Sequence, residues 1–228
     1  SYFRNGANFS NLEIKSKISL GLFLGSKENN QYAESVVNIY FPHLSKYLGN
    51  STKEKIIFSN RLHEPLYNID RILELFADFL TEHPDWTLVV GATGSQSEKL
   101  KTLSEELNIT NKVKFVGWLK KEDNDKYYSQ SSIYISIPAS DGTAVSLLEA
   151  MSAGCIPVVA DLPVSREWII DGLNGIIIKK DKNALLEALN IDRLKCLNYN
   201  TDLINSKAIR KNTTQHFYEL YCKIVNIN

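Results

Sequence analysis

Two carboxylates flank a short run of small residues in the middle of the chain. Asp141 is followed by Gly142, Thr143 and Ala144, and Glu149 lies in the apolar-periodic stretch that comes next. A turn of small residues before a helix leaves backbone N–H groups free, and the helix dipole favours an anion there. Carboxylates accept strong hydrogen bonds from hydroxyl groups. The segment therefore indicates a site for a ligand that carries both an anionic group and several hydroxyls.

The same segment also has a purely structural interpretation. Gly142 and Thr143 would form an ordinary turn in which the Thr143 hydroxyl caps the following helix, and Glu149 would be a surface acid. From these residues alone, both interpretations stay open.

Arg61 is the second candidate, because it lies just after the apolar run 55–59. A guanidinium at the end of a strand stays charged and can bind two oxygens of a diphosphate at once. The alternative is an exposed arginine paired with Glu64. Tyr67 fits either packing on the next helix or a contact between its phenol and a phosphate. His63 stands alone in this loop and is not predicted to be catalytic.

A glycine-rich stretch, Gly91-Ala92-Thr93-Gly94-Ser95-Gln96, resembles the glycine loop of NAD-dependent reductases. Two departures count against that assignment. Ser97 stands where the third glycine belongs, and Gly117, not an acid, follows the next strand. A nicotinamide cofactor is therefore not expected.

These candidates are embedded in an alternation of short apolar runs and helix-period segments. The predicted strands are 55–59, 87–91, 113–116, 133–137, 156–160 and 175–178. The predicted helices are 69–82, 97–107, 122–128, 145–153 and 165–170, with another around 217–224. This alternation predicts an α/β fold, a Rossmann-like doubly wound parallel sheet with right-handed crossovers. Ligands bind such sheets outside the carboxyl ends of the strands.

The alternation begins near residue 53. Residues 53–228 are therefore expected to form one Rossmann-like domain with a C-terminal helix, and residues 1–52 a linker or remnant that precedes it. Within that first segment, 18–24 fits a strand and 32–48 a helix.

Charge and cysteine content exclude several classes of protein. The 228 residues include 26 basic and 26 acidic side chains, without the basic excess of a nucleic-acid-binding domain. The three cysteines are widely spaced, which argues against a disulfide framework or a zinc site and favours a reducing compartment. No apolar run is long enough to span a bilayer, and no signal peptide opens the chain.

Taken together, several ordered segments resemble glycosyltransferase family 4, a group of retaining enzymes with two facing Rossmann-like domains (the GT-B fold). Asp141 through Glu149 resembles the family's E-x7-E region, with aspartate at the first position. The segment 56–61 resembles the strand that ends in a diphosphate-binding arginine, and 88–117 the strand, glycine loop, helix and strand. The segment 166–175 resembles its closing Asp-Gly and Asn-Gly pairs. The resemblance covers roughly residues 55–180.

The resemblance implies a role for each candidate residue. Glu149 would bind the ribose of a nucleotide, Asp141 the hydroxyls of the donor sugar, and Arg61 the diphosphate. The backbone of Gly142, Thr143 and Ala144 would face the sugar and diphosphate. Gly91 and Gly117 would lie beside the donor. The family has a lysine where this chain has Tyr67.

The function implied is transfer of a sugar, with retention, from a donor such as a UDP- or GDP-sugar to a saccharide or lipid-linked acceptor. Arg61, Asp141 and Glu149 would be the catalytic set. The acceptor would be bound by an N-terminal domain that residues 1–52 are too short to supply. The expected location is the cytoplasm, with peripheral attachment to the inner membrane face as an option.

No metal or other cofactor is expected. Asp123-Asn124-Asp125 matches the D-x-D of metal-dependent glycosyltransferases, but it falls in the first turn of a predicted helix, where acids complement the dipole. Two other functions stay open: a module that binds a nucleotide or sugar without catalysis, and, less favoured, an NAD-dependent reductase.

Overall fold

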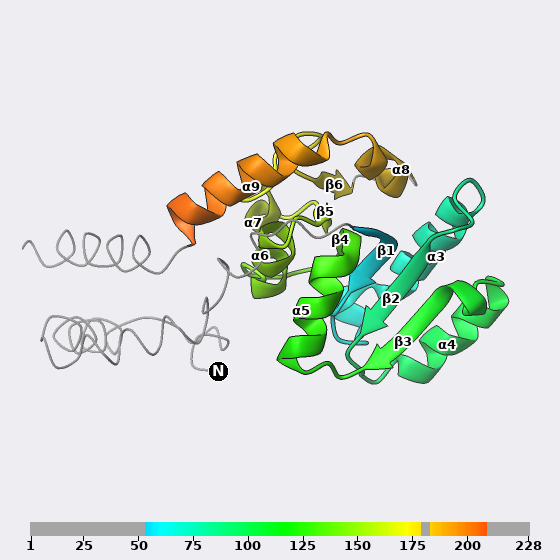
Figure 1. The fold of residues 1–228 in the computed structure, drawn as a ribbon. Coiled ribbons are helices and arrows are strands. Elements are labelled where there is room, and N and C mark those ends of the chain that lie inside the picture. The colour runs from blue at the N-terminus through cyan, green and yellow to red at the C-terminus, as the bar shows by residue number, and fades with distance from the viewer. Residues whose placement is uncertain (1–52, 179–182, 209–228) are drawn as a thin grey trace, which may run out of the picture. The chain divides into compact units, whose positions relative to one another are not determined.

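The structure, a computed structural model, describes residues 53–178 and 183–208 of the chain. The segments 18–24, 32–48 and 217–224, for which a strand and two helices are predicted, lie outside the described residues. Within the described part the predicted α/β class is confirmed (Figure 1).

One parallel sheet of six strands forms the centre of the domain, in the order β3-β2-β1-β4-β5-β6. Its strands are β1 Glu54–Ser59, β2 Thr87–Gly91, β3 Val113–Gly117, β4 Ser131–Ser136, β5 Ile156–Ala160 and β6 Ile176–Ile178. The strand order reverses between β1 and β4. At such a switch point the connections leave in opposite directions, so a crevice opens at the carboxyl ends of these two strands.

Helices cover both faces of the sheet (Figure 1). The α-helices are α3 Ile69–Leu80, α4 Ser97–Glu106, α5 Lys121–Gln130, α6 Val145–Ser152, α7 Pro163–Arg166, α8 Ala184–Leu189 and α9 Arg193–Lys207, and the 3₁₀ turns are η2 Pro65–Tyr67 and η3 Thr110–Lys112. Strand residues alternate between the two layers. Ile57 lies in the core shared with α3 and α8, whereas the next residue, Phe58, packs its ring on Tyr127 and Tyr128 of α5.

Most predicted elements differ from the observed ones by only one or two residues at each end. The predicted helix 165–170 is wrong in extent, because α7 ends at Arg166. The helical period does not predict α8 or α9. α9 is polar on most of its surface and buries only Cys196, Asn200 and Ile204, which are spaced four residues apart. Two of these positions, Cys196 and Asn200, are hydrogen-bonded to Asn174 in the segment before β6.

The closing Asn-Gly pair of the family-like segment has a structural role. Asn174 is fully buried, accepts a hydrogen bond from the Ile170 amide at 2.7 Å and donates to Asn200 at 2.7 Å. Gly175 lies so close to β5 that a Cβ on it would come within 2.7 Å of both the carbonyl oxygen and the Cγ of Pro157. The pair therefore fixes the chain between α7 and β6 against the sheet.

Lys53, just before β1, binds the ends of two helices at the edge of the sheet where the strands begin. Its ammonium donates to Tyr128 O at 2.7 Å, at the end of α5, and to Ala153 O at 2.5 Å, just beyond α6. A cation at a helix C-terminus complements the dipole, and here one cation serves two helix ends.

His63 joins the loops that follow β1 and β2. Its imidazole, buried at 2 % exposure, bonds Ser97 Oγ at 2.9 Å and Gly91 O at 3.1 Å. Burial lowers the pKa of His63 below its usual value of 6.5, and the bond to Gly91 opposes that change. His63 therefore holds these loops in its neutral form.

Gly175→Ala is expected to lower the free energy of unfolding by about 1–3 kcal/mol, because the new methyl group would be forced into Pro157. Gly142→Ala is the matched control. Its Cβ would meet nothing within 4 Å, so a change of at most roughly 0.5 kcal/mol is expected. Urea unfolding of both variants provides the measurement, and equal losses would contradict the packing argument.

His63 should make the domain sensitive to mild acid. A histidine whose folded pKa is lowered contributes stability that is complete above the unfolded pKa, near 6.5, and is lost as pH falls through the folded value. The free energy of unfolding should therefore decrease below about pH 6.5 and do so less steeply in His63→Gln. His83→Gln, in the loop between α3 and β2, serves as the control. A pH slope unchanged by His63→Gln would contradict this assignment.

Candidate functional site

The candidate residues meet at the carboxyl ends of β1 and β4, beside the switch point. Arg61 follows β1 by two residues, and the segment 137–144 leads from β4 to α6. The Arg61 guanidinium bonds Asp141 Oδ2 at 2.6 Å and Ser146 Oγ at 3.2 Å. The fold thus brings together two of the predicted site residues that lie 80 positions apart.

The guanidinium is enclosed on a third side. Its Cζ lies 4.5 Å from the centre of the Tyr67 ring, a cation–π contact. Tyr67 also packs against the hydrophobic core, as the structural interpretation predicts. The side chains of Arg61 and Asp141 are only 12 % and 23 % exposed. Arg61 does not pair with Glu64 in this structure, so that alternative is wrong.

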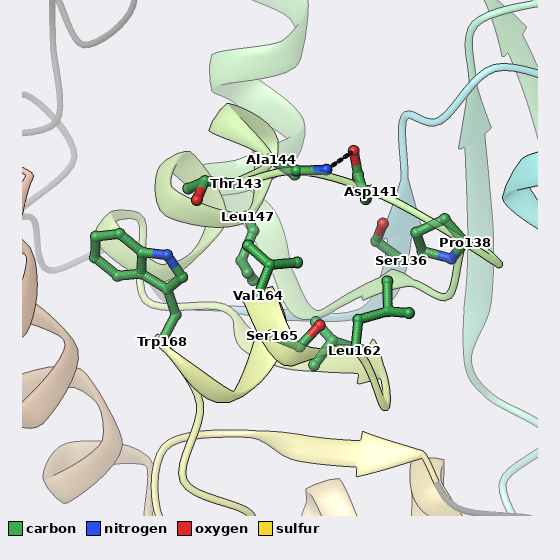
Figure 2. A pocket seen from close by; sticks show the side chains of 12 residues that line it. Ser136, Pro138, Asp141, Thr143, Ala144, Leu147, Leu162, Val164, Ser165 and Trp168 are labelled. Atoms are coloured by element: carbon green, nitrogen blue, oxygen red, sulfur yellow. Dashed lines mark hydrogen bonds between the residues drawn. The ribbon is translucent and has the colours of Figure 1, made fainter. Parts of the chain in front are cut away.

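The loop before α6 is built differently from the prediction in one respect. Thr143 is exposed and does not cap the helix; the N-cap residue is Ala144, in extended conformation, and no side chain caps this end. Instead, Asp141 Oδ1 accepts a hydrogen bond from the Gly142 amide at 2.9 Å (Figure 2). The predicted cap is wrong, and the first turn of α6 is left without a side-chain acceptor.

A pocket opens next to this loop, between α6 and α7 (Figure 2). Asp141 to Ala144 form one wall, and Leu162, Val164 and Trp168 form the other. The Trp168 indole nitrogen is buried and bonds no other described residue. Residue spacing does not predict the wall formed by Leu162, Val164 and Trp168, because apolar residues at this spacing are also typical of a helix that packs on the core.

Glu149 lies in α6 and is partly buried. Burial raises the pKa of this carboxyl, whereas its hydrogen bond with Tyr128 and the charge of Lys121 lower it. The charge of Asp125, on the same helix as Lys121, raises it. A carboxylate placed in such surroundings can accept hydrogen bonds from a ligand's hydroxyls.

In the glycine-rich stretch 91–96, both donors of Ser95 are already hydrogen-bonded. The Glu64 carboxylate accepts hydrogen bonds from Ser95 N at 2.7 Å and Ser95 Oγ at 2.6 Å. A Cβ on Gly94 would come 2.5 Å from His63 O, so this glycine permits loop packing. A pyrophosphate would meet the Glu64 carboxylate here, which disfavours dinucleotide binding by this loop.

Gly91 and Gly117 end the neighbouring strands β2 and β3 at the same edge of the sheet. Gly117 has φ +67° and accepts a hydrogen bond from Ala92 N at 2.6 Å. The next residue, Trp118, is 73 % exposed. Both glycines thus lie at the carboxyl edge of the sheet, Gly91 one strand and Gly117 two strands away from β1.

The described residues contain no cluster of three or more histidine, cysteine or acidic side chains that could hold a metal ion. Asp123 lies in the first turn of α5, as predicted, and Asp125 pairs with Lys121 at 3.2 Å. No helix in the described ranges is long and apolar enough to cross a membrane.

Comparison with known proteins agrees with this geometry. The family model "Glycosyl transferases group 1" matches residues 43–208. The alpha-monoglucosyldiacylglycerol synthase of Streptococcus pneumoniae is 28 % identical over 149 residues, which are 64 % of this chain and 34 % of that enzyme. The chain spans about a third of the length of the first curated relatives it matches.

Solved structures show the same fold. The C-terminal domain of a group 1 glycosyl transferase from Francisella tularensis superposes with a TM-score of 0.59 and 20 % identity, over 69 % of this chain and 87 % of that domain. The pneumococcal O-GlcNAc transferase GtfA, solved with UDP and GlcNAc, gives 0.56 and 19 %, over 78 % of this chain and 37 % of the enzyme. The protein therefore belongs to the group 1 glycosyl transferase family, and its described part has the fold of the C-terminal domain of GT-B enzymes.

Proposed function

We propose that this chain binds the nucleotide-sugar donor of a retaining glycosyltransferase. The observation that carries the proposal is the part-buried Arg61 guanidinium, held against the uncapped start of α6 at the switch point of the sheet. A fixed cation and free backbone N–H groups that face one crevice suit a diphosphate.

Each predicted residue has a role in this proposal. Arg61 and the backbone of Gly142 to Ala144 bind the diphosphate, Asp141 the sugar hydroxyls and Glu149 the ribose. Gly91 and Gly117 border the nucleotide. Tyr67 supports Arg61 through its ring, so its contribution to donor binding is indirect.

Donor binding would change the partner of Asp141. Without a ligand, this carboxylate neutralises Arg61. A diphosphate is a stronger, divalent partner for the guanidinium and would release Asp141 towards the sugar. Substrate binding and orientation of the sugar-binding acid would then occur together.

In the transfer, the bond between the anomeric carbon and the diphosphate oxygen breaks, and the acceptor oxygen attacks on the same face. The acceptor proton passes to the departing phosphate. Arg61 and the start of α6 stabilise the charge that develops on the leaving group, a contribution of about 3–4 kcal/mol for a well-placed donor.

The acceptor belongs to the part of the proposal that concerns the whole protein. A saccharide or a lipid-linked acceptor would be bound by a second domain, with residues 1–52 as the connection. The proposed location is the cytoplasm, with peripheral attachment to the membrane as an option. Two buried free thiols, Cys155 and Cys196, are compatible with a reducing compartment.

A nucleotide screen tests the donor assignment. In calorimetry with UDP, GDP and ADP in EDTA, at least one nucleoside diphosphate should bind, because Arg61 and the helix start supply the positive charge that a metal would otherwise provide. Binding that appears only after magnesium is added would contradict the metal-free site. A non-catalytic module would bind equally but would support no transfer when completed by the rest of the protein.

Arg61→Ala should weaken diphosphate binding by roughly ten- to a hundredfold, the loss of a charge-assisted contact. Arg61→Lys should restore only part of it, since an ammonium lacks the two-pronged geometry. Arg71→Ala, which removes an exposed arginine on α3, is the matched control and should bind like the wild type. Unchanged affinity of Arg61→Ala for the diphosphate, measured by calorimetry, would exclude Arg61 from the site.

A further inference from the structure

A closed ring of contacts joins the end of β1 to β4 and to the start of α6. Arg61 Nη1 donates to Ser146 Oγ at 3.2 Å, and Ser146 Oγ lies 2.9 Å from Tyr134 Oη. Tyr134 Oη in turn donates to Asn60 Oδ1 at 3.2 Å. Because Asn60 and Arg61 are neighbours in the sequence, the peptide bond between them closes the ring. Two adjacent side chains are thus held against β4 and α6 at once.

The chemistry of its members fixes the direction of each hydrogen bond in the ring. The Asn60 amide nitrogen donates to two other side chains, at 2.7 and 3.1 Å, so its carbonyl oxygen is the atom that faces Tyr134. This oxygen can only accept, and it uses the single phenol proton of Tyr134. In the contact between the two hydroxyls, Ser146 is therefore the donor and Tyr134 Oη the acceptor. The Ser146 proton then faces Tyr134, and a lone pair of its Oγ is left for the Arg61 guanidinium.

Tyr134 is a completely buried member of the sheet. It lies on β4 with 0 % exposure, and its ring centroid is 6.4 Å from that of Phe58. Burial raises the pKa of its phenol, so the hydroxyl keeps its proton at neutral pH. Burying a hydroxyl is unfavourable unless it is hydrogen-bonded, and phenylalanine would fill the same space without that cost. Packing alone therefore does not account for the hydroxyl at this position.

The two partners of the Arg61 guanidinium respond differently to an anion. Asp141 is a charged partner on Nη2, and in the proposed function the diphosphate takes its place. Ser146 is a neutral acceptor on Nη1, so it does not compete with the diphosphate for charge. The guanidinium can therefore exchange the partner of Nη2 while Nη1 stays bound. Ser146 is the fixed point of this exchange.

We propose that Tyr134 is a positioning residue for Arg61, acting through Ser146, and that it keeps the guanidinium directed at the diphosphate of the donor. The inference rests on the diphosphate role of Arg61 in the proposed function. Tyr134 does not itself touch the ligand. Its oxygen holds the Ser146 proton, which would otherwise be free to turn towards the guanidinium and break the contact with Nη1.

The test compares Tyr134→Phe with the unchanged full chain, using UDP, GDP and ADP and the corresponding nucleosides as ligands. Affinity for the nucleoside diphosphate that binds best should fall roughly fivefold, the effect of one net hydrogen bond. Affinity for its nucleoside, which has no phosphate for Arg61 to bind, should not change. Tyr127→Phe is the matched control, because this tyrosine also packs on the Phe58 ring, at 5.3 Å, and it should bind both ligands normally.

Arg61→Lys gives a second readout, which a purely structural role of Tyr134 would not move. An ammonium has no Nη1 group to be held, so adding Tyr134→Phe to Arg61→Lys should change diphosphate affinity by less than about twofold. Equal losses in both backgrounds, an equal loss of diphosphate and nucleoside, or no loss in Tyr134→Phe would overturn the positioning role and leave the donor site standing. If Arg61→Ala binds the diphosphate normally, the diphosphate assignment fails and the inference fails with it.

Should Tyr134→Phe not fold, substitutions of the half-buried Ser146 examine the same ring. Ser146→Ala removes the acceptor of Nη1 and should weaken diphosphate binding roughly fivefold. Ser146→Thr keeps the hydroxyl and should bind more tightly than Ser146→Ala. Normal affinity in Ser146→Ala, or no difference between the two variants, would overturn the proposal.

Discussion

A guanidinium that is 12 % exposed must have its charge and its donors satisfied, and this requirement at Arg61 organises the site. Asp141 supplies the counter-charge, Ser146 a hydroxyl and Tyr67 the face of a ring. Asp141 and Ser146 come from the stretch between β4 and the start of α6, and Tyr67 from the loop after β1. Removing any one would leave a costly polar group in a confined place, so the loops after β1 and β4 are held to each other before any ligand arrives.

The two departures from the family pattern meet at this same group. Aspartate replaces the first glutamate of the E-x7-E region, and Tyr67 replaces the expected lysine. A lysine near Arg61 would add a like charge that must be balanced, whereas an aromatic ring stabilises the existing charge without adding another. At this site in the described part of the chain, Arg61 pairs with the short acid Asp141, and the place of the family's lysine is taken by the Tyr67 ring.

Much of this arrangement follows from sequence patterns, and the remainder depends on contacts that no pattern encodes. The strands, the helices α3 to α6, and the places of Arg61, Asp141 and Glu149 relative to them follow from period and spacing. The hydrogen bond from the Asn60 side-chain amide to Tyr128 Oη does not, because an isolated asparagine and a tyrosine in a helix give no periodic signal until the fold places them together. The Thr143 cap failed for a related reason: a hydroxyl at the right spacing caps a helix only if the backbone turns at that residue, and here the helix begins one residue later.

Lys53 gives the domain a chemical reporter of its own integrity. Its amine is held by the carbonyl ends of the two helices that carry Tyr128 and Glu149. Burial lowers its pKa, which leaves more of the amine unprotonated than in an ordinary surface lysine. Acylation would remove the charge of that nitrogen and leave it a single N–H donor, so the two carbonyl contacts could not both be kept. Labelling of Lys53 would therefore be read out as weaker attachment of the ends of α5 and α6 to the start of β1.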